Sequence, residues 1–414
     1  MEIRLKSLQL SHISHFNELH LTFSPRVTCI IGENGSGKST LLRAIALALT
    51  GTTQKGIDTK HTHIQSLMKI KGEENGYRLY EQKGEIRINY ILDEGKIFQN
   101  VILLESENNE IYFKDKGDYQ NLINQTYFPQ LVLGFPQLQG KKSYQEVPSS
   151  NKNSNVKDVL SLIYHEVDNR FEAFSAWLIK QAAIGNDKKL KGKEAVEFLI
   201  IEKIFEIVSQ VTGNQVTFRT VEYESETIWV STSDAPQGIP LSLISQGYNN
   251  VFGWIGFLVK RLAEVNPNSP DFTKEPAIVL IDEIDTYLHP KWQQTILSTL
   301  TEQFPNIQFI ITTHSPLVLI SLNSNESLAY EIREGAVIPI PHFYGRRVQD
   351  VFYEHYGIKE RPVQEIAQKI EALDEAMFDE DAEKIKKELA ELLPILGNED
   401  PIIWDAKAYL EKLS

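Results

Sequence analysis

A glycine-rich stretch at residues 32–40, GENGSGKST, constrains the fold of this chain more than any other feature. It fits the pattern G-x-x-x-x-G-K-[ST], and it follows the apolar run VTCII and precedes the apolar run LLRAIALAL. That order predicts a buried strand, a phosphate-binding loop and a helix in succession. Glycines let the backbone curl so that consecutive N–H groups point at phosphate oxygens, at the positive end of the helix. The sequence therefore predicts an α/β protein that binds a nucleotide, and its context disfavours a glycine loop without function.

Each residue of this loop is a candidate binding residue. We expect phosphate contacts from Gly32, Glu33, Asn34, Gly35, Ser36, Gly37, Lys38, Ser39 and Thr40. Lys38 is expected to bridge the β- and γ-phosphates and so to act in catalysis. The hydroxyl of Ser39 is expected to complete the coordination of Mg²⁺.

Two acidic residues follow a second apolar run, in AIVLIDEIDTYLHP. Residues 277–281 form a continuous apolar stretch, which is typical of a strand buried on both faces. Asp282 is then placed to hold Mg²⁺, directly or through water, and Glu283 to polarise a water molecule for attack on the γ-phosphate. The alternative is a carboxylate pair in a surface turn.

A histidine follows a third apolar run, in IQFIITTHSP. Pro316 blocks continuation of the strand, so His314 is expected at the carboxyl end of the sheet, where open α/β sheets bind ligands. An imidazole at that place can contact the γ-phosphate and sense its loss. A histidine at a strand end can also be structural, but the other two motifs favour the functional interpretation.

The stretch ISQGYNNVFGWIGF, residues 244–257, has a polar beginning and an apolar continuation. Ser245 and Gly247 at the N-terminus of a helix suit anion binding, and the apolar residues behind them anchor the helix. Without the other motifs, a plain N-cap would be the simpler interpretation.

Together these motifs resemble the ABC-type ATPase heads of the SMC and RecF superfamily. The segment ISQGY resembles that family's signature L-S-x-G-x, with Ile244 in place of leucine. The resemblance implies ATP and Mg²⁺ as cofactors, and it implies that Ser245, Gln246 and Gly247 cap the γ-phosphate of an ATP held by a second subunit. A head-to-head homodimer is therefore expected, and larger assemblies stay open.

The same resemblance assigns two further elements. Asp285 matches the position of the D-loop, which crosses the dimer interface in such heads. The glutamine loop, which contributes a magnesium ligand, falls in LVLGFPQLQGKK, where Gln137 and Gln139 both qualify.

The resemblance implies an α/β fold, a P-loop ABC-type ATPase head with a mixed sheet, a helical-hairpin insertion and a C-terminal helical cap. We expect a first ATPase lobe at residues 1–150, the helical insertion at 151–215, a second lobe at 216–340 and the C-terminal helical region at 341–414. Two helices are expected in the insertion, at residues 156–181 and 193–212, separated by a lysine loop. They lack the sustained heptads of a long coiled coil.

The last region resembles the C-terminal part of the PtuA family, the ATP-binding subunits of Septu-type anti-phage systems, which also occur with some retrons. Residues 341–414 lack the acidic pattern of the nuclease domain in OLD-family ATPases. The resemblance implies that an HNH nuclease, encoded nearby, is the partner, and that the acidic tail docks it. A solvated helix pair that caps the domain is the alternative.

Charge and hydrophobicity limit which partners and which cellular location are expected. The formal net charge of −14 argues against a surface that binds nucleic acid throughout. A lysine run could still contact the phosphates of DNA or of retron-derived nucleic acid, and the alternative is that the run is a solvated loop. The run contains Lys188, Lys189, Lys191 and Lys193, and Arg346 with Arg347 form a lesser basic pair. No apolar run is long enough to span a membrane, and no signal peptide is evident, so we expect a cytoplasmic protein. Cys29, the single cysteine, is expected to fill the core.

Three functions remain. The first is a defence ATPase that controls a nuclease. The second is a RecF or SMC type ATPase that binds duplex DNA in repair or chromosome maintenance, and the third, least favoured, is an ATPase subunit of a transporter.

Overall fold

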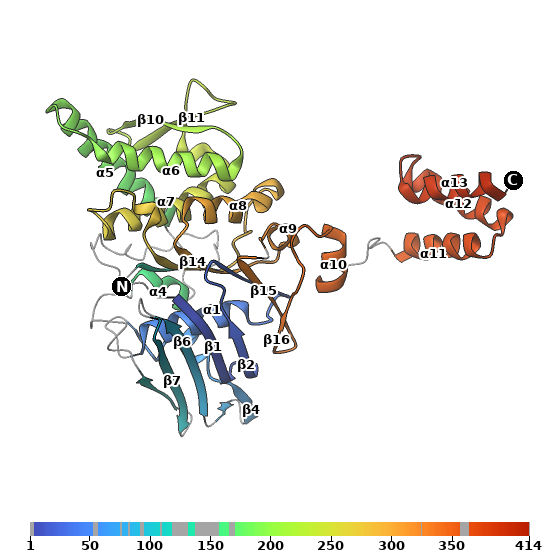
Figure 1. Cartoon of the computed structure of the whole chain (residues 1–414), viewed down its shortest axis with the longest axis horizontal. Coiled ribbons are helices and arrows are strands. Elements are labelled where there is room, and N and C mark those ends of the chain that lie inside the picture. The colour runs from blue at the N-terminus through green and yellow to red at the C-terminus, as the bar shows by residue number, and fades with distance from the viewer. Residues whose placement is uncertain are drawn as a thin grey trace. The chain divides into compact units, whose positions relative to one another are not determined.

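The computed structural model describes residues 4–52, 57–74, 77–81, 83–91, 95–107, 110–117, 131–136, 157–164, 170–323, 325–356 and 364–413. The chain divides into two units, Met1–Val348 and Gln349–Ser414. The first is an α/β unit built on a mixed sheet, as predicted, and the second is helical (Figure 1).

The central sheet of the first unit has six strands in the order β16-β15-β3-β14-β13-β9. Their bounds are β3 Val27–Gly32, β9 Leu131–Phe135, β13 Ala277–Ile281, β14 Ile307–Thr312, β15 Ser327–Arg333 and β16 Ala336–Pro339. All neighbours are parallel except β15 and β16. Every residue of β3, β13 and β14 is buried, which is why these strands are mostly apolar on both faces and why the sequence predicts them well.

A second, antiparallel sheet has the order β2-β1-β6-β7-β8. Its strands are β1 Arg4–Ile13, β2 Phe16–Thr22, β6 Lys83–Ile91, β7 Ile97–Glu107 and β8 Glu110–Gly117. The apolar residues of β1 and β2 alternate with polar ones and face the core, as is typical of an antiparallel pair with one buried face. Nearby lie α2 Thr62–Gln65 and the small hairpin of β4 Ile70–Glu74 and β5 Tyr77–Tyr80.

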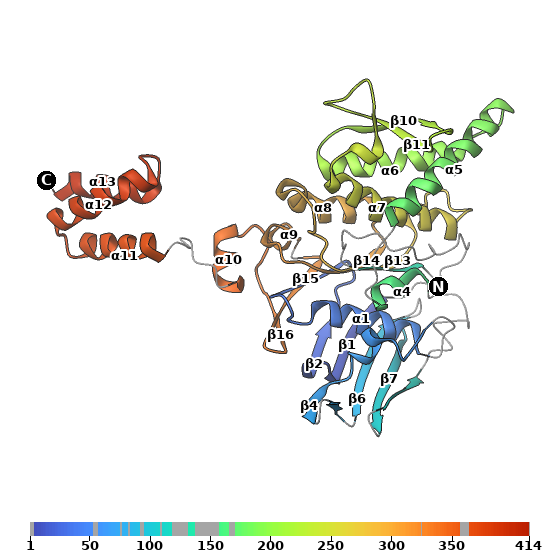
Figure 2. The same cartoon turned by 180° about the vertical axis from the view of Figure 1, so that it is seen from behind.

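Helix α1, Lys38–Thr50, lies between these two sheets and contacts strands of both (Figure 2). Its apolar residues join one core cluster with residues of both sheets, for example Leu42, Ile86 and Ile310. A helix buried on nearly all sides accounts for the run LLRAIALAL. Its first residue follows β3 through the glycine-rich loop, so the predicted succession of strand, loop and helix is confirmed.

Helices cover the other side of the central sheet (Figures 1 and 2). They are α5 Arg170–Leu190, α6 Val196–Thr212, α7 Gln246–Val265 and α8 Pro290–Gln303. A sheet of β10 Val216–Glu222, β11 Thr227–Thr232 and β12 Ile239–Pro240 lies beside them. Three short helices complete this part of the chain: η1 Leu241–Leu243 after β12, η2 Phe272–Lys274 after α7 and α9 Pro316–Ile320 after β14. β10 and β11 pair as an antiparallel hairpin ahead of α7.

The helices of the insertion differ from the expectation. The stretch expected as one helix at 156–181 contains α4, Lys157–Tyr164, and the start of α5, and α4 packs on α1 and β9. The lysine loop begins later than expected, because Lys188 and Lys189 form the last turn of α5. Lysine favours helix, and cations suit the negative end of a helix, so this run extends the helix.

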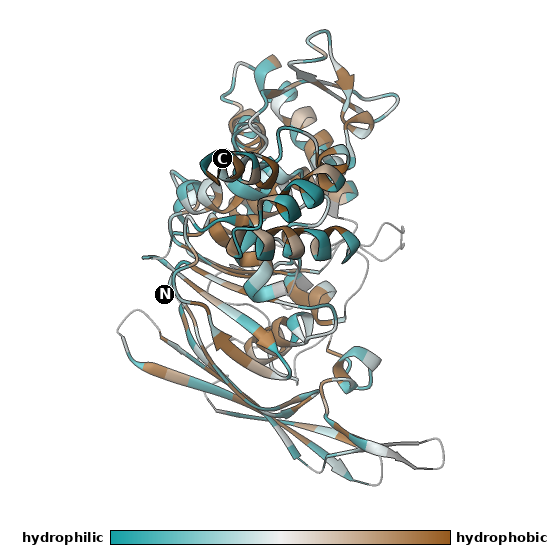
Figure 3. Cartoon of the chain, turned by 90° about the vertical axis from the view of Figure 1, so that its right-hand side faces the viewer, coloured by the Kyte–Doolittle hydropathy of each residue, from teal (hydrophilic) through white to brown (hydrophobic). Residues whose placement is uncertain are grey.

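The second unit contains α11 Gln364–Phe378, α12 Ala382–Leu396 and α13 Pro401–Leu413, and α10 Val348–Tyr356 begins at the boundary. Its helices carry both hydrophilic and hydrophobic residues (Figure 3). Their apolar residues, including Leu373, Ile385, Leu392 and Ile403, form a core cluster of their own. The second unit therefore has a hydrophobic core of its own. Across the described parts of both units, no helix is long and apolar enough to cross a membrane.

Candidate nucleotide-binding site

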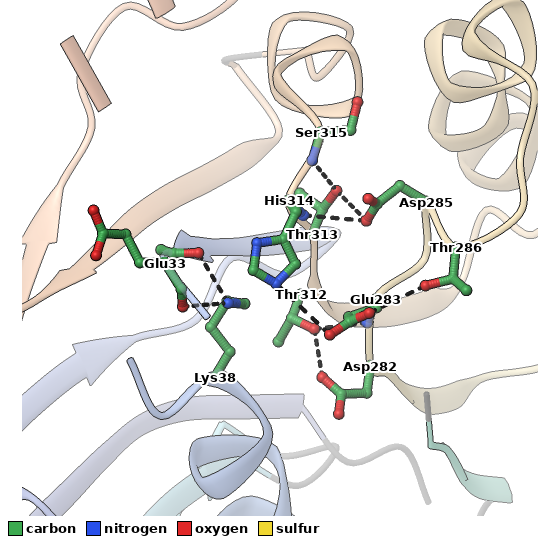
Figure 4. A network of polar contacts seen from close by, with 11 residues as sticks. Glu33, Lys38, Asp282, Glu283, Asp285, Thr286, Thr312, Thr313, His314 and Ser315 are labelled. Carbon is green, nitrogen blue, oxygen red and sulfur yellow. Dashed lines mark hydrogen bonds and ion pairs between the residues drawn. The ribbon is translucent and has the colours of Figure 1, made fainter. Parts of the chain in front are cut away.

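The three predicted motifs meet at one edge of the central sheet. β3, β14 and β13 are adjacent and parallel, with Cys29 opposite Ile311 and Ile311 opposite Ile281. Their carboxyl ends therefore lie side by side, and the segments that follow them converge (Figure 4). Strand register thus brings together residues that are far apart in the sequence, such as Lys38 and His314.

Lys38 is held inside the glycine-rich loop. Its Nζ donates hydrogen bonds of 2.9 Å to the carbonyl oxygens of Gly32 and of Glu33, and the residue is 5% exposed. Burial lowers the pKa of Lys38, and the charges of Glu283, Asp282 and Asp285 act in the opposite direction. Gly37, the N-cap of α1, has a left-handed φ of 105° that suits glycine. The ammonium group is thus preorganised on carbonyl oxygens at the positive end of α1, where phosphate can replace them.

Asp282 follows β13 and is 2% exposed. The hydroxyl of Thr312 donates a hydrogen bond of 2.6 Å to its Oδ1. The same hydroxyl accepts the backbone N–H of Glu283 at 2.7 Å. Thr312 therefore fastens the carboxyl ends of β13 and β14 to each other. No motif in the sequence indicates this role for Thr312, and its only signal is a threonine pair between an apolar strand and His-Ser-Pro.

The residues present fit a magnesium ion held jointly with a nucleotide. Mg²⁺ usually takes one or two carboxylates and keeps its other positions for water and phosphate oxygens. Asp282 supplies such a carboxylate at the strand end, and Ser39 supplies a hydroxyl from the first turn of α1. The described residues hold no group of three or more histidine, cysteine or acidic side chains suited to a metal. The donor set therefore fits a nucleotide-bound ion better than an all-protein cage.

Glu283 has an ionised carboxylate held from two sides. Its Oε2 accepts a hydrogen bond of 3.2 Å from the hydroxyl of Thr286, and its Oε1 lies 3.6 Å from Nε2 of His314. Burial acts to raise the pKa of Glu283, but His314, Thr286 and the charge of Lys38 outweigh burial and lower it. A carboxylate that stays ionised and aimed is suited to polarise water.

Asp285 is engaged within its own chain. Its Oδ1 accepts hydrogen bonds from the Thr313 hydroxyl at 2.5 Å and from the backbone N–H of His314 at 3.2 Å. Ser315 caps α9 and donates to Gln293 of α8 at 2.6 Å. These contacts fix the backbone on which His314 stands (Figure 4). Thr313 and Gln293 are further site residues that the motifs alone did not indicate.

The signature segment, residues 244–248, leads into α7. Ser245 is the N-cap, yet its side chain makes no capping hydrogen bond, and both Ser245 and Gln246 are exposed. An added Cβ on Gly247 would lie 2.9 Å from the carbonyl oxygen of Tyr287 and 2.9 Å from the ring of Trp292. The plain N-cap interpretation therefore does not account for the serine hydroxyl, and glycine is required at 247 by close packing.

Other predicted residues are not part of the described network. Gln137 and Gln139 fall outside the described residues. In the basic run, Lys188 pairs with Glu197 at 2.5 Å and Lys191 with Asp187 at 2.6 Å, so half of its charge is neutralised locally. Phosphate binding by this run stays a prediction. Cys29 is buried in β3, and burial raises the pKa of its thiol, as expected of a core residue.

Comparison with known proteins identifies relatives. Residues 27–321 match the family described as "AAA domain, putative AbiEii toxin, Type IV TA system". The retron Vc95 probable ATPase of Vibrio cholerae serotype O1 biovar El Tor is 28% identical over 78% of this chain and 73% of its own length. The Septu protein PtuA of Bacillus thuringiensis is 26% identical over 94% of this chain and 89% of its own length. The DNA replication and repair protein RecF of Staphylococcus haemolyticus is 23% identical over 81% of this chain and 100% of its own length.

Proposed function

The chain belongs to this AAA-domain family, and on that premise we propose that it is the ATP-binding and ATP-hydrolysing subunit of an anti-phage defence complex. ATP-dependent dimerisation of its heads controls a partner nuclease of the HNH type. The relatives named for a retron and for Septu support the defence role.

One observation carries the enzymatic part of the proposal. Lys38, Asp282, Glu283 and His314 meet at the carboxyl ends of adjacent parallel strands, with Glu283 kept ionised. Lys38 and the loop amides bind the β- and γ-phosphates, and Glu283 orients water toward the γ-phosphate while His314 contacts it. Ser39 and Asp282 hold Mg²⁺, which neutralises charge on the phosphate oxygens when it is bound.

The exposed start of α7 supports dimerisation. The Ser245 hydroxyl makes no capping hydrogen bond to the helix. The first turn of α7 presents backbone N–H groups at the positive end of a 20-residue helix. A phosphate on the loop of a second subunit is the ligand that such an arrangement suits. ATP then joins two heads, each contributing its loop to one site and its signature segment to the other.

The test is copurification with the products of neighbouring genes, with and without ATP, followed by mass measurement of the complex. We expect an HNH nuclease to copurify, with a head dimer in the presence of ATP. A chain that binds no ATP would overturn the whole proposal. ATP hydrolysis by a chain that never associates with a nuclease would overturn only the nuclease control.

The RecF relative supports a second candidate function, a repair ATPase that binds duplex DNA across closed heads. Such binding should require ATP and should weaken steeply with salt, because counterions are released from the phosphates. Salt-dependent DNA affinity without a nuclease partner would favour this function over the first.

A further inference from the structure

A polar path connects the signature helix α7 with the carboxylate of Glu283. Asn250 lies in the first turns of α7, is 8% exposed, and its Nδ2 donates a hydrogen bond of 2.6 Å to the carbonyl oxygen of Thr286. The hydroxyl of Thr286 in turn donates to Oε2 of Glu283 at 3.2 Å. Two hydrogen bonds therefore separate the signature helix from the proposed general base.

A second contact makes the connection stiff. Gly247 lies three residues before Asn250, on the same side of the helix. A Cβ added to it would lie 2.9 Å from the carbonyl oxygen of Tyr287, the residue after Thr286. The start of α7 thus bears on two consecutive residues of the turn after β13, by a close backbone approach and by a hydrogen bond. A shift of this helix end must move that turn.

The amide oxygen of Asn250 adds nothing to stability. Its Oδ1 is buried and accepts no hydrogen bond from the part of the chain that the structure describes. A buried amide oxygen without a partner is destabilising, and a leucine of similar size would avoid that cost. What asparagine supplies and leucine lacks is the N–H group that reaches Thr286.

We propose that Asn250 is a positioning residue that transmits the position of the signature segment to Glu283 of the same chain. The inference rests on the proposed function, in which a nucleotide on a second subunit contacts Ser245 and Gly247. That nucleotide fixes the start of α7, and Asn250 through Thr286 then holds the Glu283 carboxylate against its own substrate water. Hydrolysis on one head is thereby coupled to nucleotide bound on the other.

The test compares the full chain carrying Asn250→Leu or Asn250→Asp with the wild type. Leucine removes both the N–H donor and the carbonyl acceptor of the side-chain amide. Aspartate keeps the shape but, when ionised, removes the donor. Asn266→Ala is the matched control, because Asn266 also donates one hydrogen bond to a backbone carbonyl, that of Leu262 at 3.0 Å, at the far end of α7. The readouts are kcat and KM for ATP, the thermal midpoint, and the lifetime of the ATP-bound dimer.

We expect both Asn250 variants to lower kcat about tenfold at nearly unchanged KM, as loss of an interaction that acts on the chemical step does. The ATP-bound dimer should last longer. Asn250→Leu loses the hydrogen bond to Thr286 but also loses the unpaired Oδ1, so its melting temperature should fall no further than that of Asn266→Ala, which loses a comparable hydrogen bond. An unchanged kcat in the Asn250 variants would overturn the inference. So would an equal fall of kcat in Asn266→Ala, because the loss would then follow stability alone. A wild type that hydrolyses ATP beside unaffected Asn250 variants leaves the proposed function standing, whereas a wild type that binds no ATP removes both.

Discussion

The imidazole Nε2 of His314 lies 3.6 Å from Oε1 of Glu283, although the two residues follow different strands. Their approach depends on the parallel pairing of β13 and β14, in which Ile281 lies opposite Ile311. A shift of one residue in either strand would turn the side chains of that strand to the opposite face of the sheet, away from those of its neighbour. The proposed water-activating carboxylate and the proposed γ-phosphate contact are therefore aligned by the same strand register.

Replacing Glu283 by glutamine should trap the ATP-bound dimer. Glutamine keeps the size of the side chain and an acceptor for Thr286 but cannot act as a base, so turnover should fall about 100-fold or more while ATP binding survives. Phosphate release and the mass of the complex measure both effects. Glu302→Gln, on the exposed side of α8, should behave as the wild type. A monomeric Glu283→Gln chain without ATP would contradict the assignment.

Replacing Lys38 by alanine should weaken ATP binding by about 10- to 100-fold, the range expected when a charge-assisted hydrogen bond is lost. Titration with a fluorescent ATP analogue measures the affinity. Lys291→Ala changes an exposed lysine at the start of α8 and should leave affinity unchanged. Full affinity in a folded Lys38→Ala chain would remove the argument from the glycine-rich loop.

Lys38→Ala and Ser245→Arg should complement each other if sites are shared between heads. Neither variant alone should dimerise with ATP, but a mixture contains heterodimers with one intact loop facing one intact signature segment. Dimer formation on mixing, followed by light scattering, tests this arrangement. Two well-folded variants that stay monomeric when mixed would count against it. Coupling through Asn250 adds that the heterodimer should turn over more slowly per site than the wild type.

Removing the Thr312 hydroxyl should destabilise the site itself. Thr312→Val keeps the shape but removes one hydrogen bond of Asp282 and the acceptor of the Glu283 N–H. We expect a loss of about 1–3 kcal/mol in the free energy of unfolding, together with weaker activation by Mg²⁺. Chemical denaturation and a magnesium titration measure the two effects. Thr301→Val, which removes a half-buried hydroxyl that donates to the carbonyl oxygen of Leu297 in α8, should leave the magnesium dependence unchanged.

The lowered pKa of Glu283 sets the direction of a pH effect. A carboxyl whose pKa is lower in the folded state stabilises the fold fully above its unfolded pKa of about 4.3, and this contribution is lost as pH falls through the folded pKa. The stability difference between the wild type and Glu283→Gln should therefore be constant around neutral pH and should shift against the wild type only in acid. Thermal midpoints across a pH series provide the measurement. A difference that already changes near neutrality would show that Glu283 titrates there.

Much of the site could be predicted from contiguous residues. The strands at 27–32, 277–281 and 307–312 are recognisable because strands buried on both faces are rich in apolar residues, and the residues that follow each strand necessarily lie at its end. The phosphate loop needs only its own glycines and the helix that follows. The length of α5 was underestimated because a lysine run is compatible with both a loop and a helix end.

Contacts across the sheet could not be read from the sequence. Thr312 bridges Asp282 and Glu283, and Asn250 reaches Thr286, only because parallel register and the seating of α7 bring them together. Local pattern determines which element a residue occupies and which side is apolar, since these depend on neighbours along the chain. Which hydroxyl or amide meets which carboxylate depends on distances between separate elements, and packing of the whole core determines those.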